Sequence, residues 1–162
     1  MPDYLQVRGL QGGYDGKAVV EDVALDVEKG SLTALLGANG AGKSTLMKLV
    51  AGLLRPFAGQ VLFDGEDMTG RDARRMVQGG VSYVPEGRAI ARALTVRENL
   101  LLGGMTRRRS DNKAQLDTVL ALFPELSERL ASPAWQLSGG QQQMMVIGRA
   151  LKDLPAGCWV NE

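Results

Sequence analysis

The sequence predicts an α/β fold, and three observations point to this class. Apolar runs of strand length occur at residues 32–37 and 80–85, and residues 23–28 alternate between apolar and polar side chains. Apolar side chains recur at helical spacing between residues 46 and 53, and again after residue 95. A glycine-rich stretch separates the first apolar run from the first helix. The 162 residues have the length of one ordinary domain.

The composition is that of a globular domain, with 44% hydrophobic and 23% charged residues. A net charge of +1 gives no electrostatic reason to expect a nucleic-acid partner. No apolar run approaches the roughly 18 residues that span a bilayer, and the first residues lack the pattern of a signal peptide. Cys158 is the only cysteine, which excludes an internal disulfide and fits a cytosolic setting. The sequence contains no histidine that could bind a metal or act as a base.

Four segments are predicted to be strands. Residues 23–28 have the period of a half-buried strand, and residues 32–37 (LTALLG) are expected to form a strand buried on both faces. Val61–Phe63 indicates a third strand, closed by the turn residues Asp64-Gly65. Residues 80–85 (GVSYVP) form a second short buried candidate.

Four segments are predicted to be helices. One face of the first helix carries Leu46, Leu49, Val50 and Leu53, and Arg55-Pro56 should end that helix. Thr95 and Glu98 have the spacing of a capping box, which starts the second helix. A third helix presents an apolar face over residues 116–123, and a fourth spans residues 138–151.

The glycine-rich stretch, GANGAGKST, matches the phosphate-loop pattern G-x-x-x-x-G-K-[ST]. Glycines let the backbone curl with its amides inward, and the start of the following helix adds a partial positive charge. A lysine can then reach the outer phosphates, and the next two hydroxyls can bind Mg²⁺ and a phosphate oxygen. A strand before it and a helix after it favour this function over a chance glycine-rich turn. The predicted residues are Gly37, Ala38, Asn39, Gly40, Ala41, Gly42, Lys43, Ser44 and Thr45.

A second motif, LSGGQ, comprises Leu137, Ser138, Gly139, Gly140 and Gln141. A serine and two glycines that open a helix offer a hydroxyl, bare amides and a helix dipole to an anion. A lone S-G-G is more often an ordinary helix cap. Together with the phosphate loop, however, this motif resembles the signature of ATP-binding cassette (ABC) ATPases. The resemblance implies that it contacts ATP held by a second cassette, in a homodimer or a heterodimer.

The resemblance also implies the architecture. The fold would be a P-loop NTPase (RecA-like) core with an N-terminal antiparallel β subdomain and an inserted α-helical subdomain. Residues 1–90 would form the β and phosphate-loop part, residues 91–137 the helical subdomain, and residues 138–162 the signature helix and Walker B region. The whole chain would be one nucleotide-binding domain whose C-terminal part is absent.

Other site residues are implied by their places in the family pattern. Tyr14 matches the aromatic residue that stacks on adenine, although a tyrosine in a turn is more often structural. Glu86 replaces the usual glutamine that senses Mg²⁺, and a solvated loop acid is an equal alternative. Asn161 falls where the family has the aspartate that holds the Mg²⁺ shell, and Glu162 falls on the catalytic glutamate.

The tail AGCWVNE, residues 156–162, is therefore read as a frameshifted or truncated ending, with a divergent but intact strand as the alternative. Asn161 is neutral, and the family's γ-phosphate histidine has no counterpart here. We expect the chain to hydrolyse ATP poorly or not at all. Two alternatives stay open: a non-hydrolysing nucleotide-binding module, and a truncated fragment without function.

Three stretches, YVPEGR, LTVRENLLLGG and LSGGQQQMM, look most like the ATP-binding subunits of branched-chain amino-acid importers. Urea and amide importers are the alternative within this branch. The resemblance implies integral membrane permease subunits as direct partners and a periplasmic substrate-binding protein as an indirect one. It implies ATP and Mg²⁺ as cofactors, no nucleic-acid partner, and a cytoplasmic place on the inner face of the plasma membrane, held there by the permease.

Overall fold

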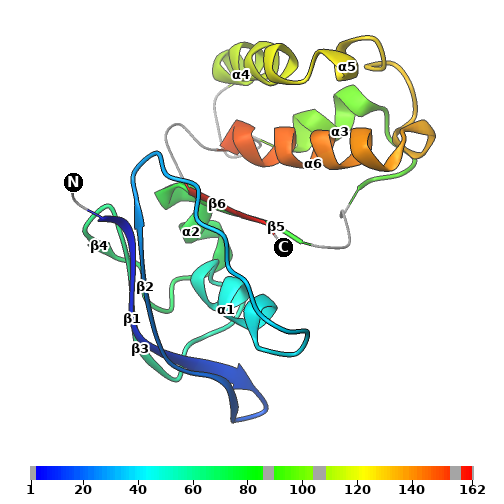
Figure 1. Cartoon of the computed structure of the whole chain (residues 1–162). Helices are drawn as coiled ribbons and strands as arrows, with labels where there is room; N and C mark the ends of the chain where they lie inside the picture. The colour runs from blue at the N-terminus through cyan, green and yellow to red at the C-terminus, as the bar shows by residue number, and fades with distance from the viewer. Residues whose placement is uncertain (1–2, 86–89, 104–108, 154–157, 162) are drawn as a thin grey trace. The chain divides into compact units, whose positions relative to one another are not determined.

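The computed structural model describes residues 3–85, 90–103, 109–153 and 158–161 (Figure 1). The chain divides into two compact units, Met1–Gly79 and Gly80–Glu162. The elements of the first unit are β1 (Asp3–Tyr14), β2 (Lys17–Glu28), α1 (Lys43–Val50), β3 (Ala58–Phe63), β4 (Glu66–Asp67) and α2 (Ala73–Gly79). Those of the second are β5 (Val81–Val84), α3 (Val96–Leu102), α4 (Arg109–Leu122), α5 (Pro124–Ser127), the 3₁₀ turn η1 (Ala134–Gln136), α6 (Gly139–Asp153) and β6 (Cys158–Asn161).

The first unit is built on an antiparallel sheet with the strand order β2-β1-β3-β4. The central strand β1 places Leu5 and Val7 opposite Phe63 and Val61 of β3, and all four side chains are buried. The register shifts between Val7 and Leu10, which lets Leu10 point into the core as well. An antiparallel sheet with one apolar face gives this unit a core against which a helix can pack.

Two tight hairpins fix the register of this sheet. Asp15 and Gly16 join β1 to β2 with φ angles of 51° and 75°. Asp64 and Gly65, predicted as a turn, join β3 to β4 with φ angles of 48° and 81°. Positive φ at both central residues is the geometry of the two-residue turn that matches strand twist.

The predicted alternation in β2 is confirmed. Val23, Leu25 and Val27 are half-buried, and the residues between them are exposed. The strand begins earlier than predicted, at Lys17, because its first part pairs with β1.

Helix α1 packs against β1 at a glycine. A Cβ atom built on Gly12 would lie 2.5 Å from Cδ2 of Leu49, so only a glycine permits this approach. Leu46, Leu49 and Val50 are buried, as their helical spacing predicted. The helix ends at Val50 rather than at Arg55-Pro56, because Gly52 turns the chain with a φ of 70°.

The expected buried strand at residues 32–37 is wrong. The segment from Ser31 to Ala38 forms neither strand nor helix, and it is exposed throughout. Leu32 is 92% exposed and Leu36 is 89% exposed. A strand needs a neighbour to complete its backbone hydrogen bonds. Within the described part of the chain, no strand pairs with this segment.

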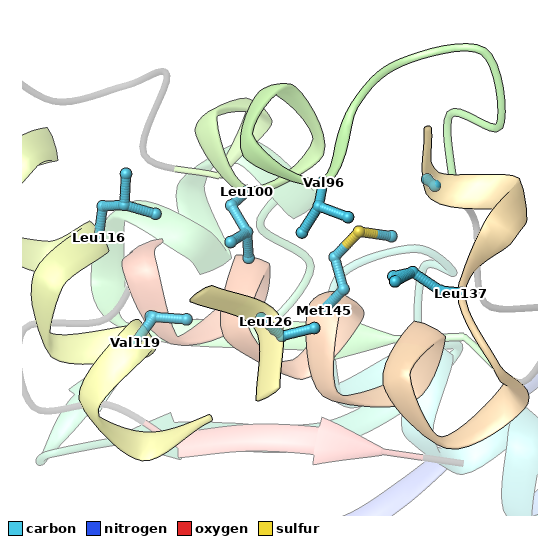
Figure 2. Close-up of a cluster of buried hydrophobic side chains, with 8 residues drawn as sticks. Val96, Leu100, Leu116, Val119, Leu126, Leu137 and Met145 are labelled. Atoms are coloured by element: carbon cyan, nitrogen blue, oxygen red, sulfur yellow. The ribbon is translucent and has the colours of Figure 1, made fainter. Parts of the chain in front are cut away.

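The second unit packs its helices around one apolar cluster (Figure 2). Leu100 of α3, Val119 of α4 and Met145 of α6 point into it, together with Leu126 of α5. The buried members are Val96, Leu100, Leu116, Val119, Leu126, Ala134, Leu137 and Met145. The helical spacings read from the sequence are therefore confirmed as core-facing.

The start of α3 confirms the predicted capping box. The hydroxyl oxygen of Thr95 accepts a hydrogen bond from the Glu98 backbone N–H at 3.2 Å, and the Thr95 backbone N–H donates to the Glu98 carboxylate at 2.8 Å. The Thr95 hydroxyl donates to the same carboxylate at 2.7 Å. The backbone bond first, and the hydroxyl bond second, lower the pKa of Glu98 below its ordinary value.

Strands β5 and β6 form a parallel pair in which Val81 lies opposite Cys158 and Val84 opposite Asn161. The prediction of a strand at residues 80–85 is confirmed. Both strands run in the same direction, so their carboxyl ends meet at one edge. Among the residues that the structure describes, no helix is both long and apolar enough to cross a membrane.

Candidate functional site

The phosphate loop lies directly before α1 in the first unit. Gly40 and Gly42 have φ angles of 83° and 86°, in the left-handed region that favours glycine. The Ala41 backbone N–H donates to the Ala38 carbonyl at 3.2 Å, which closes a turn in the loop. The Leu46 N–H then donates to the Gly42 carbonyl at 2.8 Å, so the helix begins immediately after the loop. Its first amides are therefore next to the loop and can favour an anion.

Lys43 folds back over this loop. Its Nζ donates to the Gly37 carbonyl at 2.9 Å and to the Ala38 carbonyl at 2.8 Å. The side chain therefore spans the loop from the helix start to the first two loop residues. Residues 37–41 are exposed, so an anion can reach the loop from solvent. A phosphate group at the loop would compete with these carbonyls for the ammonium.

The glycines of the loop differ in what they contact. A Cβ atom built on Gly40 would meet nothing within 4 Å, so the space at the loop tip is open. A Cβ atom on Gly42 would lie 3.1 Å from the Val19 carbonyl oxygen of β2, so the end of the loop is held against the sheet. Ser44 is half-buried and Thr45 is 5% exposed in the first turn of α1. Ser44 is the more accessible of the two hydroxyls for a metal ion.

Tyr14 ends β1 at the β1–β2 hairpin, and its side chain is 43% exposed. Its hydroxyl lies 3.4 Å from the ammonium of Lys48, a residue of α1, the helix that follows the phosphate loop. The predicted phosphate-binding and adenine-binding residues thus lie in the same compact unit.

The signature motif lies in the second unit, where η1 leads into α6. Leu137 is buried in the helical core, and the three residues after it, Ser138, Gly139 and Gly140, are exposed. The Ser138 hydroxyl oxygen accepts from the Gln141 backbone N–H at 3.3 Å, and the Ser138 backbone N–H donates to Oε1 of Gln141 at 3.1 Å. These two bonds form a capping box.

The reciprocal role of Gln141 was missed by the sequence reasoning, although the S-x-x-Q spacing carries the signal. A Cβ atom built on Gly140 would meet nothing within 4 Å of the described chain. Packing inside the chain therefore does not require a glycine there. An exposed serine followed by bare helix amides leaves this end of α6 accessible to an anion from outside.

Three predicted residues receive less support. Glu86 and Glu162 lie outside the described residues. Asn161 is described in its backbone, as the last residue of β6 and the partner of Val84. The strand that the family pattern implies before residue 161 is therefore formed over Cys158–Asn161. The described residues contain no cluster of three or more histidine, cysteine, aspartate or glutamate side chains that could hold a metal ion.

Comparison with known proteins defines the class of protein. The sequence model of the ABC transporter family matches residues 20–156. The chain belongs to this family. The high-affinity branched-chain amino acid transport ATP-binding protein BraG of Pseudomonas aeruginosa is 43% identical over 143 residues, which are 88% of this chain and 61% of the relative. The protein named "Probable branched-chain amino acid transport ATP-binding protein LivF", from Archaeoglobus fulgidus, is 37% identical over 88% of this chain and 60% of its own length.

Relatives named for other imported substrates also match, among them the sulfate/thiosulfate import protein CysA of Bordetella bronchiseptica at 39% identity over 98% of this chain and 45% of the relative. Among solved structures, the ADP conformation of MJ1267, an ATP-binding cassette of an ABC transporter, is 26% identical with a TM-score of 0.83. That match covers 94% of this chain and 66% of the other. The chain spans about 60% of the length of the two branched-chain relatives.

Proposed function

We propose that this chain is the nucleotide-binding part of an ABC importer and that residues 37–45 bind the phosphates of MgATP. The geometry of the loop carries this proposal. Gly40 and Gly42 hold left-handed backbone conformations, which a phosphate-binding loop of this pattern uses to curl around an anion. Lys43 already spans the loop with its ammonium on two carbonyls, where it can exchange them for phosphate oxygens.

The metal ion is proposed to bind on the Ser44 side of the loop. Ser44 is half-buried in the first helical turn, and its hydroxyl oxygen is a hard ligand of the kind that Mg²⁺ takes. The predicted further ligands, Glu86 and Asn161, also carry oxygen donors. When bound, Mg²⁺ neutralises charge on the outer phosphates.

The signature segment is proposed to complete the site of a second cassette. Ser138, Gly139 and Gly140 are exposed, and the space beside Gly140 is open, which supports a role toward an outside partner. That partner would be a second copy or a related cassette. Membrane permease subunits would hold the pair at the inner face of the plasma membrane, and a periplasmic binding protein would act indirectly.

Branched-chain amino acids are proposed as the imported substrates, because two branched-chain relatives match 88% of the chain. Co-purification of this chain with the permease subunits of a branched-chain amino-acid importer, and with those of a sulfate importer, tests this specificity without requiring ATP turnover. The proposal expects binding to the first set of permease subunits, and binding to the sulfate permease alone would contradict it.

Impaired hydrolysis is proposed as a separate property. Asn161 offers a neutral amide where the family pattern has a carboxylate. A non-hydrolysing module that binds ATP and pairs with an intact cassette is therefore the favoured second function. ATP turnover by the wild type clearly above that of Lys43→Ala would contradict impaired hydrolysis. If the neutral amide of Asn161 causes the impairment, Asn161→Asp should raise the rate of ATP turnover.

A thermal melt with and without MgATP tests nucleotide binding. A ligand that binds only the folded state must raise the melting temperature. The proposal expects a shift for the wild type and none for Lys43→Ala, which lacks the ammonium and whose fold is checked by its melt without nucleotide. Equal shifts in both proteins would show that nucleotide binds elsewhere.

A further inference from the structure

Lys48 contacts the predicted adenine-binding residue. Its Nζ donates to the Tyr14 hydroxyl at 3.4 Å and lies 6.0 Å from the centre of the Tyr14 ring. The two residues are far apart in the sequence, but both belong to the first unit. An ammonium at this distance from an aromatic ring attracts it, and the attraction is modest at an exposed site.

The backbone on both sides of this contact is fixed. Tyr14 pairs with Lys17 across the hairpin turn at Asp15-Gly16. Gly12, on the same strand, touches Leu49 of α1 so closely that a side chain at position 12 would clash. Helix α1 therefore packs closely on β1 two residues before Tyr14, and Lys48, the residue before Leu49, lies beside the tyrosine.

The side chain of Tyr14 has fewer constraints than its backbone. It is 43% exposed, so an aromatic ring at the end of a strand could sample several rotamers in solvent. A contact from Lys48 to its hydroxyl restricts that freedom and leaves part of the ring accessible. Ordering a free side chain on binding costs affinity, and a side chain already held in place lowers this cost.

We infer that Lys48 is a positioning residue that holds Tyr14 in place for a nucleotide base. The inference rests on the proposed function, because it needs the base of a nucleotide beside Tyr14. One helix would then serve both ends of the ligand: Lys43 at its start would bind the phosphates, and Lys48 in its last turn would orient the aromatic residue.

The competing explanation is that Lys48 attracts the anionic ligand by its charge alone. The two explanations differ in one measurable respect. Inorganic tripolyphosphate carries the phosphates of ATP without a base. A charge effect acts on tripolyphosphate at least as strongly as on ATP, whereas a positioning effect acts on ATP only.

The experiment measures the dissociation constants of MgATP and of magnesium tripolyphosphate by calorimetry. Lys48→Met should weaken MgATP binding about two- to fivefold, the size expected from freeing one side chain, and leave tripolyphosphate binding unchanged. Lys48→Arg should restore MgATP binding. In a Tyr14→Ala background, Lys48→Met should have no further effect, because the residue on which it acts is gone.

Lys29→Met is the matched control. Lys29 Nζ lies 5.1 Å from the ring of Tyr4, at the other end of β1, so this variant removes a similar lysine–tyrosine contact and the same charge. It should change neither constant. Equal weakening of both ligands by Lys48→Met, or no weakening of MgATP, would overturn the inference while the phosphate loop stands. If the wild type bound neither ligand, the proposed function would fall and the inference with it.

Discussion

Ser138 and Gln141 bond to each other at the start of α6. The serine hydroxyl accepts from the glutamine backbone N–H at 3.3 Å, and the glutamine side chain accepts from the serine backbone N–H at 3.1 Å. The two residues thus satisfy backbone donors that the first helical turn leaves without partners. The same serine is the residue proposed to meet the ATP of a second cassette, so under that proposal one side chain would serve both helix stability and partner binding.

Ser138→Ala should therefore lower the free energy of unfolding by about 1 kcal/mol, the usual loss for a helix cap. Gln141→Ala should lower it less, because its own backbone N–H keeps the serine oxygen as a partner. Urea unfolding followed by circular dichroism measures both. Ser127→Ala, at an exposed position at the end of α5, is the control. A Ser138→Ala variant as stable as the wild type would show that the cap contributes nothing.

Replacing two glycines of α6 by alanine should have different effects on the stability of the chain. A Cβ atom at Gly148 would lie 2.6 Å from Cγ1 of Val119, so Gly148→Ala forces α4 and α6 apart and should cost about 1–3 kcal/mol. A Cβ atom at Gly140 would meet nothing within 4 Å, so Gly140→Ala should not destabilise the chain.

Gly140→Ala should instead weaken ATP-dependent pairing with an intact cassette, because the added methyl group lies where the partner's nucleotide is proposed to approach. Sedimentation with and without MgATP checks the pairing, and a melt checks the fold. If Gly140→Ala paired as well as the wild type, the signature segment would not be at the interface.

Glu98 should make α3 sensitive to acid. Its folded pKa is lowered by hydrogen bonds from Thr95, relative to an ordinary value of 4.5. A lowered folded pKa adds stability that is present above the unfolded pKa and is lost as the pH falls through the folded one. The difference in melting temperature between the wild type and Glu98→Gln should therefore be largest near neutral pH and shrink below pH 4.5.

Glu125→Gln serves as the control for Glu98, because Glu125 is exposed in the first turn of α5. A difference between wild type and Glu98→Gln that stayed constant from pH 7 down to strongly acid pH would contradict the assigned hydrogen bonds.

The exposed segment from Ser31 to Ala38 should promote self-association. Leu32 is 92% exposed, and the described strands leave the backbone of this apolar segment without a paired neighbour. Leu32→Lys should reduce concentration-dependent association, as measured by sedimentation velocity. Leu122→Lys, at a 60% exposed position on α4, should have little effect. Equal association of the wild type and Leu32→Lys would show that the segment is not the adhesive surface.

Sequence reasoning predicted most of the local structure correctly where one face of an element is buried. Leu100, Val119 and Met145 lie on three different helices and point into one shared core. Each helix therefore needs apolar side chains on one face, which gives the helical spacing seen in the sequence. It failed at residues 32–37, because apolar character alone does not supply a strand partner. It also missed β1, where glycines and a register shift interrupt the regular alternation, and α2, a short helix in which only Met76 is buried.

For the candidate site, the sequence predicted where the glycine-rich loop and the signature segment precede helices, and the structure has helices at both places. The roles of these residues in nucleotide binding stay predictions. The contact between Lys48 and Tyr14 was not predictable, because it joins a helix to a distant hairpin and depends on packing at Gly12. Sequence spacing carries no information about such a contact without the fold.

A calorimetric titration of MgATP into the wild type, Lys43→Ala and Lys113→Ala tests whether residues 37–45 bind the nucleotide. Lys113 is an exposed lysine on α4, so its loss removes the same charge far from the loop in sequence. We expect the wild type and Lys113→Ala to bind one MgATP with saturation, and Lys43→Ala to lose this binding. Unchanged binding by Lys43→Ala would contradict the assignment of residues 37–45 as the nucleotide site.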